Sequence, residues 1–326
     1  MRFSASLTTG MAHAFLPRAP SPSAFAEAPA PFDPAGCGCC FNPSRRLFTG
    51  LLAAGTGALL AGPAASWARE GVDVGPPSSF SKLVSAEDVE KAAVQQYAQI
   101  KQGAGQQGAL APDNHPQVIR LRSIAQRLIP YSYEWNPRAR QWTWEINLIG
   151  SKQLNAFCMP AGKIAFYSGI LEQLQLSDAE VAMIMGHEIT HALREHAREK
   201  MGKSAATRGA IEITSSLFGV KGGGRLVADL GNQLLALRFG REDETEADLV
   251  GMELSARAGY DPAAGISLWE KMGRASKGAP PQFLSTHPSG PTRIKDIRDS
   301  LPKVEGLYAR AAKPEREFGP PPKREG

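Results

Sequence analysis

Residues 177–200 read SDAEVAMIMGHEITHALREHAREK, and this stretch determines how the rest of the chain is interpreted. Ser177 and Glu180 have the spacing of a capping box, in which each side chain accepts a hydrogen bond from the backbone amide of the other. Behind this cap, apolar residues recur at helical spacing from Val181 to Met185. This pattern predicts an amphipathic helix that packs on a core.

Two histidines lie in the middle of the predicted helix. His187 and His191 are four residues apart, about 40° out of line on a helix of 3.6 residues per turn, so both imidazoles can close on one ion. Glu188 is placed to reach a water on that ion rather than the ion itself. This is the HExxH arrangement of zinc peptidases, with two nitrogen ligands and a general base. Two solvated histidines on a surface helix are the alternative, which the cap and the amphipathic pattern disfavour.

Composition narrows the class of protein. The chain has 326 residues, of which 42% are hydrophobic and 21% charged, as in soluble globular proteins. Its formal net charge is +5, but no dense basic run accompanies that charge. We therefore expect no nucleic-acid partner.

Residues 1–68 have the features of an export signal. The sequence SRRLF at Ser44–Phe48 precedes a Gly- and Ala-rich apolar run, and Ser66–Ala68 supplies the small residues of a cleavage site. The stretch resembles twin-arginine export signals and predicts a periplasmic protein. A mitochondrial transit peptide or an uncleaved anchor is the alternative. After Ala68 no run approaches the roughly 18 apolar residues of a membrane span, and Cys158 remains as a single thiol, expected to be buried.

Periodicity predicts an α+β fold: a mostly helical, zincin-like metalloprotease domain in which a small sheet precedes the HExxH helix. Before that helix we expect helices at 85–102 and 116–129 (the second stopped by Pro130) and strands at 142–149, 154–159 and 163–167. After it we expect helices at 205–218, 225–239 and 241–258, and one more after Pro262. The expected segments are an export signal (1–68), an N-terminal helix and linker (69–114), a zinc metallopeptidase domain (115–312) and a disordered tail (313–326).

The third zinc ligand decides the subclass of peptidase. Metzincins use a histidine six residues past the second one, but Ala197 stands there in this chain. His196 lies nearly opposite His191 on a continuous helix, which predicts a solvated residue. The better candidates are the acidic residues of the stretch GREDETEADLVG, at 240–251.

At this point the sequence resembles the gluzincin peptidases that include HtpX, the CAAX prenyl endopeptidases and periplasmic proteases of outer-membrane quality control. Besides HExxH, the matching strings are R-x-x-E-x-E-A-D-x-x-G at 241–251, NAFCMPAG at 155–162, and H-P-x-x-x-x-R-I at 287–294. Ala161 departs from the usual glycine of the second string. The lack of a later apolar span points to the soluble, exported branch.

The resemblance implies that one glutamate of the first string binds zinc. Glu244 and Asp248 are four residues apart and share a helix face, whereas Glu246 is about 200° from Glu244. We therefore predict that Glu244 binds the metal with His187 and His191. Asp248 should accept a hydrogen bond from a ligating histidine, and Glu246 should be a surface or ion-pair residue.

The resemblance also implies roles near the substrate. His287, steadied by Arg293, would stabilise the oxyanion or gate the site, although a plain loop histidine before a proline is the alternative. The strand at 155–159 would act as a sheet edge that takes up an extended substrate.

Three functions fit these motifs. The first is a zinc endopeptidase for unfolded or mis-assembled envelope proteins, with outer-membrane assembly proteins as partners. The second is a chaperone on the same zinc fold that cuts rarely. The third is a small-molecule metallohydrolase, which the peptidase strings disfavour.

Overall fold

The computed structural model describes residues 69–207, 234, 237–276, 282–288 and 292–322. The export signal, and most of the helices expected at 205–218 and 225–239, lie outside the described residues. In chain order the elements are η1 (Ser79–Leu83), α1 (Ala86–Gln106), α2 (Pro116–Ser132), η2 (Pro137–Arg140), β1 (Glu145–Ile149), β2 (Ala156–Met159), β3 (Lys163–Tyr167), α3 (Ser168–Gln173), α4 (Asp178–Leu193), α5 (His196–Thr207), α8 (Arg241–Arg257), α9 (Ala264–Ala275), α10 (Gln282–Thr286), α11 (Arg293–Ser300) and α12 (Pro302–Arg310). The predicted α+β class, with a small sheet before the HExxH helix α4, is confirmed.

The sheet has the strand order β1-β3-β2, with β1 parallel and β2 antiparallel to β3. A three-residue turn joins β2 to β3, and in it Ala161 and Gly162 take φ values of 64° and 71°. Ala161 thus adopts a left-handed conformation that is usually occupied by glycine. This order makes β2 an edge strand of the sheet.

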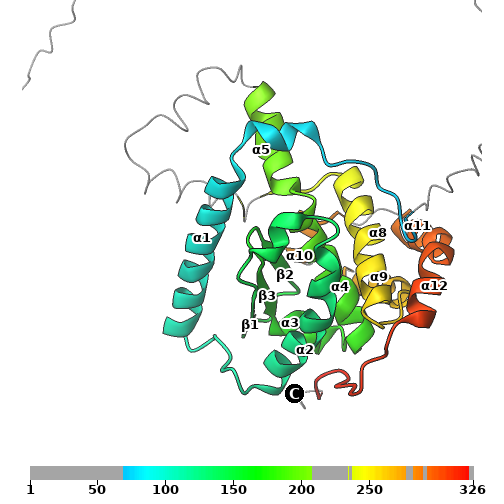
Figure 1. Cartoon of the computed structure of the whole chain (residues 1–326). Helices are drawn as coiled ribbons and strands as arrows, with labels where there is room; N and C mark the ends of the chain where they lie inside the picture. Colours follow the sequence, from blue (N-terminus) through cyan, green and yellow to red (C-terminus); the bar gives the residue numbers. More distant parts are fainter. Residues whose placement is uncertain (1–68, 208–233, 235–236, 277–281, 289–291, 323–326) are drawn as a thin grey trace, which may run out of the picture. The chain divides into compact units, whose positions relative to one another are not determined.

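Alternating side chains give the sheet two buried faces, as the period of two in a strand requires. One face packs against α2 and α4 in the main core, through residues such as Leu148, Ile164 and Phe166. The other face packs against α1, through Ile149 and Ala165. The sheet therefore lies between α1 on one side and the helices α2 and α4 on the other (Figure 1).

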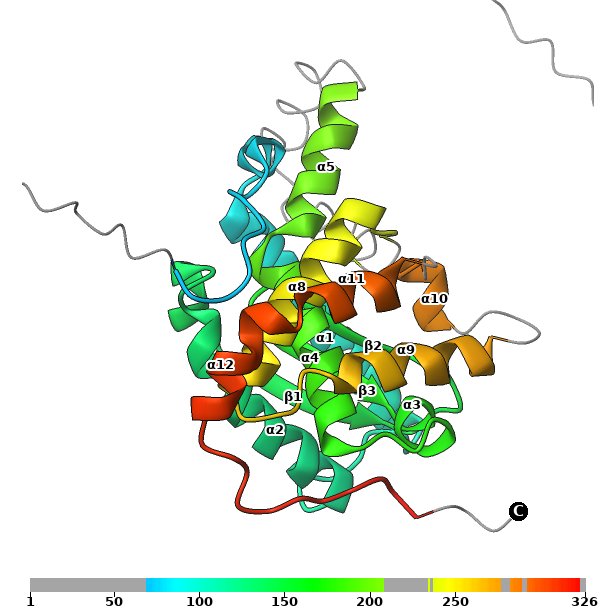
Figure 2. The ribbon, with the colours of Figure 1, turned by 90° about the vertical axis from the view of Figure 1, so that its right-hand side faces the viewer.

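Helix α4 is the centre of the structure. Its N-terminus has the predicted capping box, because Ser177 and Glu180 each accept from the backbone amide of the other. Every residue of α4 except Ala179 is buried, so the helix is covered on all sides rather than on one amphipathic face. The sheet covers one side, and α8 and α9 cover another (Figure 2).

Helices α4 and α8 approach each other through two glycines. A Cβ atom added to Gly186 would lie 2.7 Å from the carbonyl oxygen of Gly251, and one added to Gly251 would lie 2.6 Å from the backbone nitrogen of His187. Real Cβ atoms do not come this close to backbone atoms, so the two helices touch backbone to backbone. This contact lies beside the first histidine of HExxH.

Two helix boundaries differ from the sequence prediction. Helix α1 continues to Gln106 through the expected linker, because Ala104 packs in the cluster that covers the sheet. That burial offsets the roughly 1 kcal/mol that a glycine costs in a helix. Helix α2 continues past Pro130 to Ser132. A proline this near the C-terminus removes one backbone hydrogen bond, so the helix ends soon after it instead of at it.

The expected disordered tail is also corrected for residues 313–322. They form an extended segment that contacts the start of α4 and the residues just before it. Phe318 donates its backbone N–H to Asp178 Oδ2 at 2.7 Å, and Gln175 donates to the carbonyl of Pro321 at 3.1 Å. No helix among the described residues is long and apolar enough to cross a membrane.

Candidate metal centre

Four buried side chains from three parts of the chain converge beside the middle of α4. His187 and His191 lie one turn apart, with their Nε2 atoms separated by 3.1 Å. Glu244, from the first turns of α8, brings its two oxygens within 3.5 Å of His187 Nε2 and 3.6 Å of His191 Nε2. His287 follows α10, and its Nδ1 lies 3.2 Å from His187 Nε2. One ligand atom from each of the four residues lies within 4.8 Å of all the others.

The outer nitrogens of the two helix histidines have partners of their own. His187 Nδ1 lies 3.1 Å from Asp248 Oδ1, and His191 Nδ1 lies 2.8 Å from His196 Nδ1. An ionised carboxylate only accepts hydrogen bonds, so His187 carries its proton on Nδ1. If His191 also donates through Nδ1, both Nε2 atoms present lone pairs to the centre of the cluster.

The centre of the cluster therefore contains more hydrogen-bond acceptors than donors among its nitrogen and oxygen atoms. His287 Nδ1 can donate one hydrogen, to Glu244 Oε1 at 3.1 Å or to His187 Nε2. The remaining lone pairs of His187, His191 and Glu244 face one another, which is favourable only around a cation. Tetrahedral zinc with ligands at about 2.0–2.2 Å places neighbouring ligand atoms about 3.3–3.6 Å apart. The distances between His187 Nε2, His191 Nε2 and the nearer oxygens of Glu244 are 3.1–3.6 Å, close to that spacing, and the donor set of two imidazoles and a carboxylate suits zinc.

A buried arginine fixes the carboxylates of α8. Arg293 donates to both oxygens of Asp248, at 2.7 and 2.6 Å, and to Glu244 Oε2 at 2.7 Å, while its guanidinium covers the ring of Trp269. Burial alone would raise the pKa of Asp248, but Arg293 and His187 outweigh burial and lower that pKa to about 2. The approach of Arg293 to His187 Nδ1 is longer, at 3.4 Å. Both carboxylates are therefore ionised and held in place.

Arg293 does not bond His287 directly, as the sequence prediction had it. Its side-chain hydrogen bonds to other side chains reach Asp248 and Glu244, and it meets His287 only through Glu244 and the neighbouring carbonyl of Pro288. Arg293 thus holds the carboxylates of Glu244 and Asp248 on the side away from His191 and Glu188. The HExxH string alone gave no sign of this contact, because Arg293 and Asp248 are 45 residues apart.

The prediction for His196 is also wrong. It is not solvated but buried, and it contacts His191 because the helix does not continue through residue 195. Glu195 has φ 58°, and this left-handed residue separates α4 from α5 and turns His196 back over His191. Glu246 forms an ion pair with Arg194, in line with the ion-pair role expected for it, and its other oxygen lies 3.4 Å from His196 Nε2.

Glu188 lies next to the cluster without being part of it. Its side chain is buried, and its Oε1 has no hydrogen-bond partner among the described residues. His287 Nε2 is 3.5 Å from that oxygen. Burial raises the pKa of Glu188, although the charges of His287 and His187 act in the opposite direction. A buried carboxylate of raised pKa with one oxygen unpaired among the described residues is suited to take up a proton.

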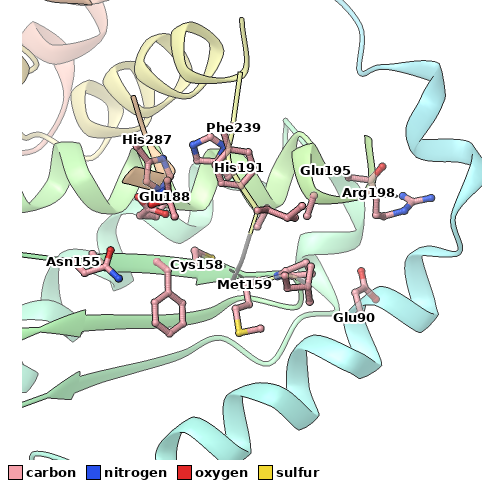
Figure 3. Close-up of a pocket in the computed structure, with 18 of the residues that line it drawn as sticks. Glu90, Asn155, Cys158, Met159, Glu188, His191, Glu195, Arg198, Phe239 and His287 are labelled. Carbon is pink, nitrogen blue, oxygen red and sulfur yellow. Dashed lines mark hydrogen bonds and ion pairs between the residues drawn. The ribbon is translucent and has the colours of Figure 1, made fainter. Parts of the chain in front are cut away.

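A cavity of about 100 Å³ opens onto Glu188, His191 and His287. Its opposite wall is the segment 155–159, so the cavity separates the edge strand β2 from the HExxH helix (Figure 3). Cys158 lies on this strand; burial raises the pKa of its thiol well above the usual value, and the thiol stays protonated. Phe239 stacks on the His191 ring with 3.9 Å between ring centroids and forms another part of the wall.

Comparison with known proteins identifies the family. A sequence profile of peptidase family M48 matches residues 117–301, more than half of the chain. The chain belongs to peptidase family M48. The resemblance to gluzincin peptidases, inferred from the motifs, is thereby confirmed. The M48 region contains every residue of the cluster and the edge strand β2, whereas α1 precedes it.

Three named proteins are similar in sequence to this chain. The mitochondrial metalloendopeptidase OMA1 of Arabidopsis thaliana is 39% identical over 165 residues, covering 51% of this chain and 33% of the relative. The metalloprotease LoiP of Escherichia coli K12 is 27% identical over 194 residues, covering 59% and 73%. The beta-barrel assembly-enhancing protease of Yersinia pestis is 28% identical over 191 residues, covering 55% and 38%. The match thus spans a third of the Arabidopsis relative.

Proposed function

We propose that this M48 chain is a zinc-dependent endopeptidase. The observation that carries the proposal is the convergence of lone pairs from His187, His191 and Glu244 beside Glu188, whose Oε1 has no hydrogen-bond partner among the described residues. A chaperone that never cuts would have no use for a buried base aimed at a metal centre. The cavity between this base and an edge strand gives an extended peptide access to both.

His187, His191 and Glu244 would hold the ion. When bound, zinc would supply a Lewis acid that polarises a carbonyl and lowers the pKa of a water toward neutrality. Glu188 takes the proton from the attacking water and passes it to the leaving amine. Asp248 fixes the proton of His187 on Nδ1, and the outer edge of β2 would align an extended substrate so that the scissile bond lies over Glu188.

The proposal is tested on the purified chain. We expect about one zinc per chain by elemental analysis, and hydrolysis of an unfolded protein such as reduced casein that a chelator abolishes and added zinc restores. Zinc binding without cleavage, together with suppressed aggregation of an unfolded protein, would instead support the chaperone function. A chain that binds no zinc would contradict both.

His287 is proposed to gate the site. Catalytic zinc keeps one position open for water, but His287 Nδ1 lies among the ligand atoms and its Nε2 faces Glu188. We therefore expect His287→Ala to retain zinc and to raise the rate of casein cleavage. The increase should be about 3- to 10-fold if the open arrangement is populated about 10–30% of the time.

The control for this variant is its zinc content, which must match that of the unaltered chain. A loss of cleavage with zinc retained would contradict the gate and would assign His287 to the oxyanion, where one donor is worth about 10²–10³ in kcat.

For substrate and location, we propose unfolded or mis-assembled envelope proteins in the periplasm. The support is the sequence SRRLF at Ser44–Phe48 and the name of one relative, a beta-barrel assembly-enhancing protease. Other relatives are named as mitochondrial, and a transit peptide is the competing interpretation of the same residues. Outer-membrane assembly proteins are the proposed partners.

Export through the twin-arginine route predicts a phenotype for the paired arginines. Replacing Arg45 and Arg46 by lysine should leave uncleaved precursor in the cytoplasm of a bacterial host, because the paired guanidinium groups identify the signal. Cell fractionation and immunoblotting measure the result. Replacing the exposed Arg274 by lysine serves as the control and should not alter export. Unimpaired export of the lysine variant would favour the general secretory route.

A further inference from the structure

A series of side chains contacts the outer nitrogen of His191, and it is separate from the side chains that contact the outer nitrogen of His187. We propose that His196 positions His191 for metal binding by accepting the hydrogen of its Nδ1, and that Glu246 in turn holds His196. This inference rests on the proposed zinc site and adds two positioning residues to it.

The contacts lead from His191 through His196 and Glu246 to Arg194, away from the centre of the metal cluster. His191 Nδ1 lies 2.8 Å from His196 Nδ1, and His196 Nε2 lies 3.4 Å from Glu246 Oε2. The other oxygen of Glu246 accepts from Arg194 Nε. Arg194 also donates to the carbonyl of Gly75 at 2.8 Å, which fixes the outer end of the chain of contacts.

Only one placement of hydrogens satisfies these contacts with neutral rings. Two imidazole nitrogens 2.8 Å apart need one hydrogen between them. His196 Nε2 makes no hydrogen bond among the described residues, but it faces Glu246 Oε2 at 3.4 Å. A lone pair on Nε2 would repel that carboxylate, so His196 carries its hydrogen on Nε2 and leaves a lone pair on Nδ1. His191 must then donate through Nδ1, and its Nε2 lone pair faces His187 and Glu244. This is the tautomer that a metal ligand requires.

The backbone supports a role for His196 beyond packing. On a continuous helix a residue five positions after His191 would point away from it, about 140° around the axis. The left-handed conformation of Glu195, with φ 58°, brings His196 back. A non-glycine residue in this region is disfavoured, and such outliers persist where the surrounding structure fixes them, often at functional sites.

The two helix histidines therefore have parallel support. Behind His187 stand a carboxylate and an arginine, Asp248 and Arg293. Behind His191 stand a histidine and then a carboxylate and an arginine, Glu246 and Arg194. For His187, the carboxylate of Asp248 contacts the ring directly. For His191, the imidazole of His196 lies between the ring and the carboxylate of Glu246.

The test compares two substitutions of His196 in the full chain. Leucine fills a similar volume but accepts no hydrogen bond, whereas asparagine offers its Oδ1 near the position of the lost Nδ1. By competition with a chromophoric chelator, we expect His196→Leu to raise the Kd for zinc about 10- to 100-fold and His196→Asn to stay within about threefold of the unaltered chain.

Met201→Ala is the matched control. Met201 is buried on the same helix, α5, and packs with Val84 and Val89 instead of the metal cluster. This variant should lower the melting temperature and leave zinc affinity unchanged. A role of His196 in packing alone predicts equal weakening by leucine and asparagine, and that result would overturn the inference.

A second measurement needs no variant. Long-range proton–nitrogen NMR spectra of the chain with labelled histidines should place the hydrogen of His191 on Nδ1 and that of His196 on Nε2. A hydrogen on Nδ1 of His196 would refute the proposed direction of donation. If the unaltered chain binds zinc but either test fails, the inference alone falls; if it binds no zinc, the proposed function falls with it.

Discussion

Replacing Glu188 by glutamine is expected to remove proteolysis while zinc stays bound. The side chain is buried beside the metal cluster with one oxygen unpaired, and it is not among the four ligand-bearing residues. Glutamine has nearly the same shape but cannot take a proton from water. Loss of a general base costs about 10²–10⁴-fold in rate. Cleavage of casein by the purified variant measures the loss.

Zinc content and melting temperature are the controls for Glu188→Gln, and both should match those of the unaltered chain. Near-normal cleavage with zinc retained would contradict the role of Glu188 as the base. Continued suppression of aggregation by the inactive variant would reveal a chaperone activity that does not depend on cutting.

Glu244→Gln is expected to lower zinc occupancy sharply. Glutamine is neutral, so the cluster loses the only negative charge among its four members. Arg293 also loses one of its charged partners, and removing one partner of a buried ion pair costs about 3–5 kcal/mol. Asp248→Asn should weaken zinc binding by about 10- to 100-fold, because an amide holds the His187 proton less well. Elemental analysis after dialysis against a weak chelator compares these variants.

Glu246→Gln tests the other glutamate, two residues away on the same helix. Glu246 lies behind His196 instead of among the four ligand-bearing residues, and its amide oxygen can still accept from Arg194. Zinc content and cleavage should therefore change little. Zinc retained by Glu244→Gln but lost from Glu246→Gln would reverse the assignment of the ligand.

Local patterns in the sequence predicted the elements that local interactions determine. The capping box at Ser177 and the start of α8 at Arg241 follow from short-range spacing. The convergence of His187, His191 and Glu244 followed from helical periodicity combined with a family resemblance. These predictions hold because a regular helix fixes which of its residues share a face.

The predictions failed where the chain departs from regular geometry or where distant segments meet. A continuous helix would leave His196 solvated, and the left-handed Glu195 that interrupts it carries no unmistakable sequence signal. The partners of Arg293 depend on how α11 packs against α8, which periodicity does not reveal. Glycine propensity predicts an early end for α1, but the packing of Ala104 on the sheet extends the helix.

The contact between Gly186 and Gly251 has a consequence for how the chain tolerates substitution. At this point the spacing between the two ligand-bearing helices is set by van der Waals radii of backbone atoms. Exchanging larger side chains elsewhere in the core changes packing volume and the free energy of unfolding. It does not change the closest approach of the two backbones. Substitutions elsewhere in the core can therefore lower the free energy of unfolding while the helices that carry His187 and Glu244 keep their closest approach.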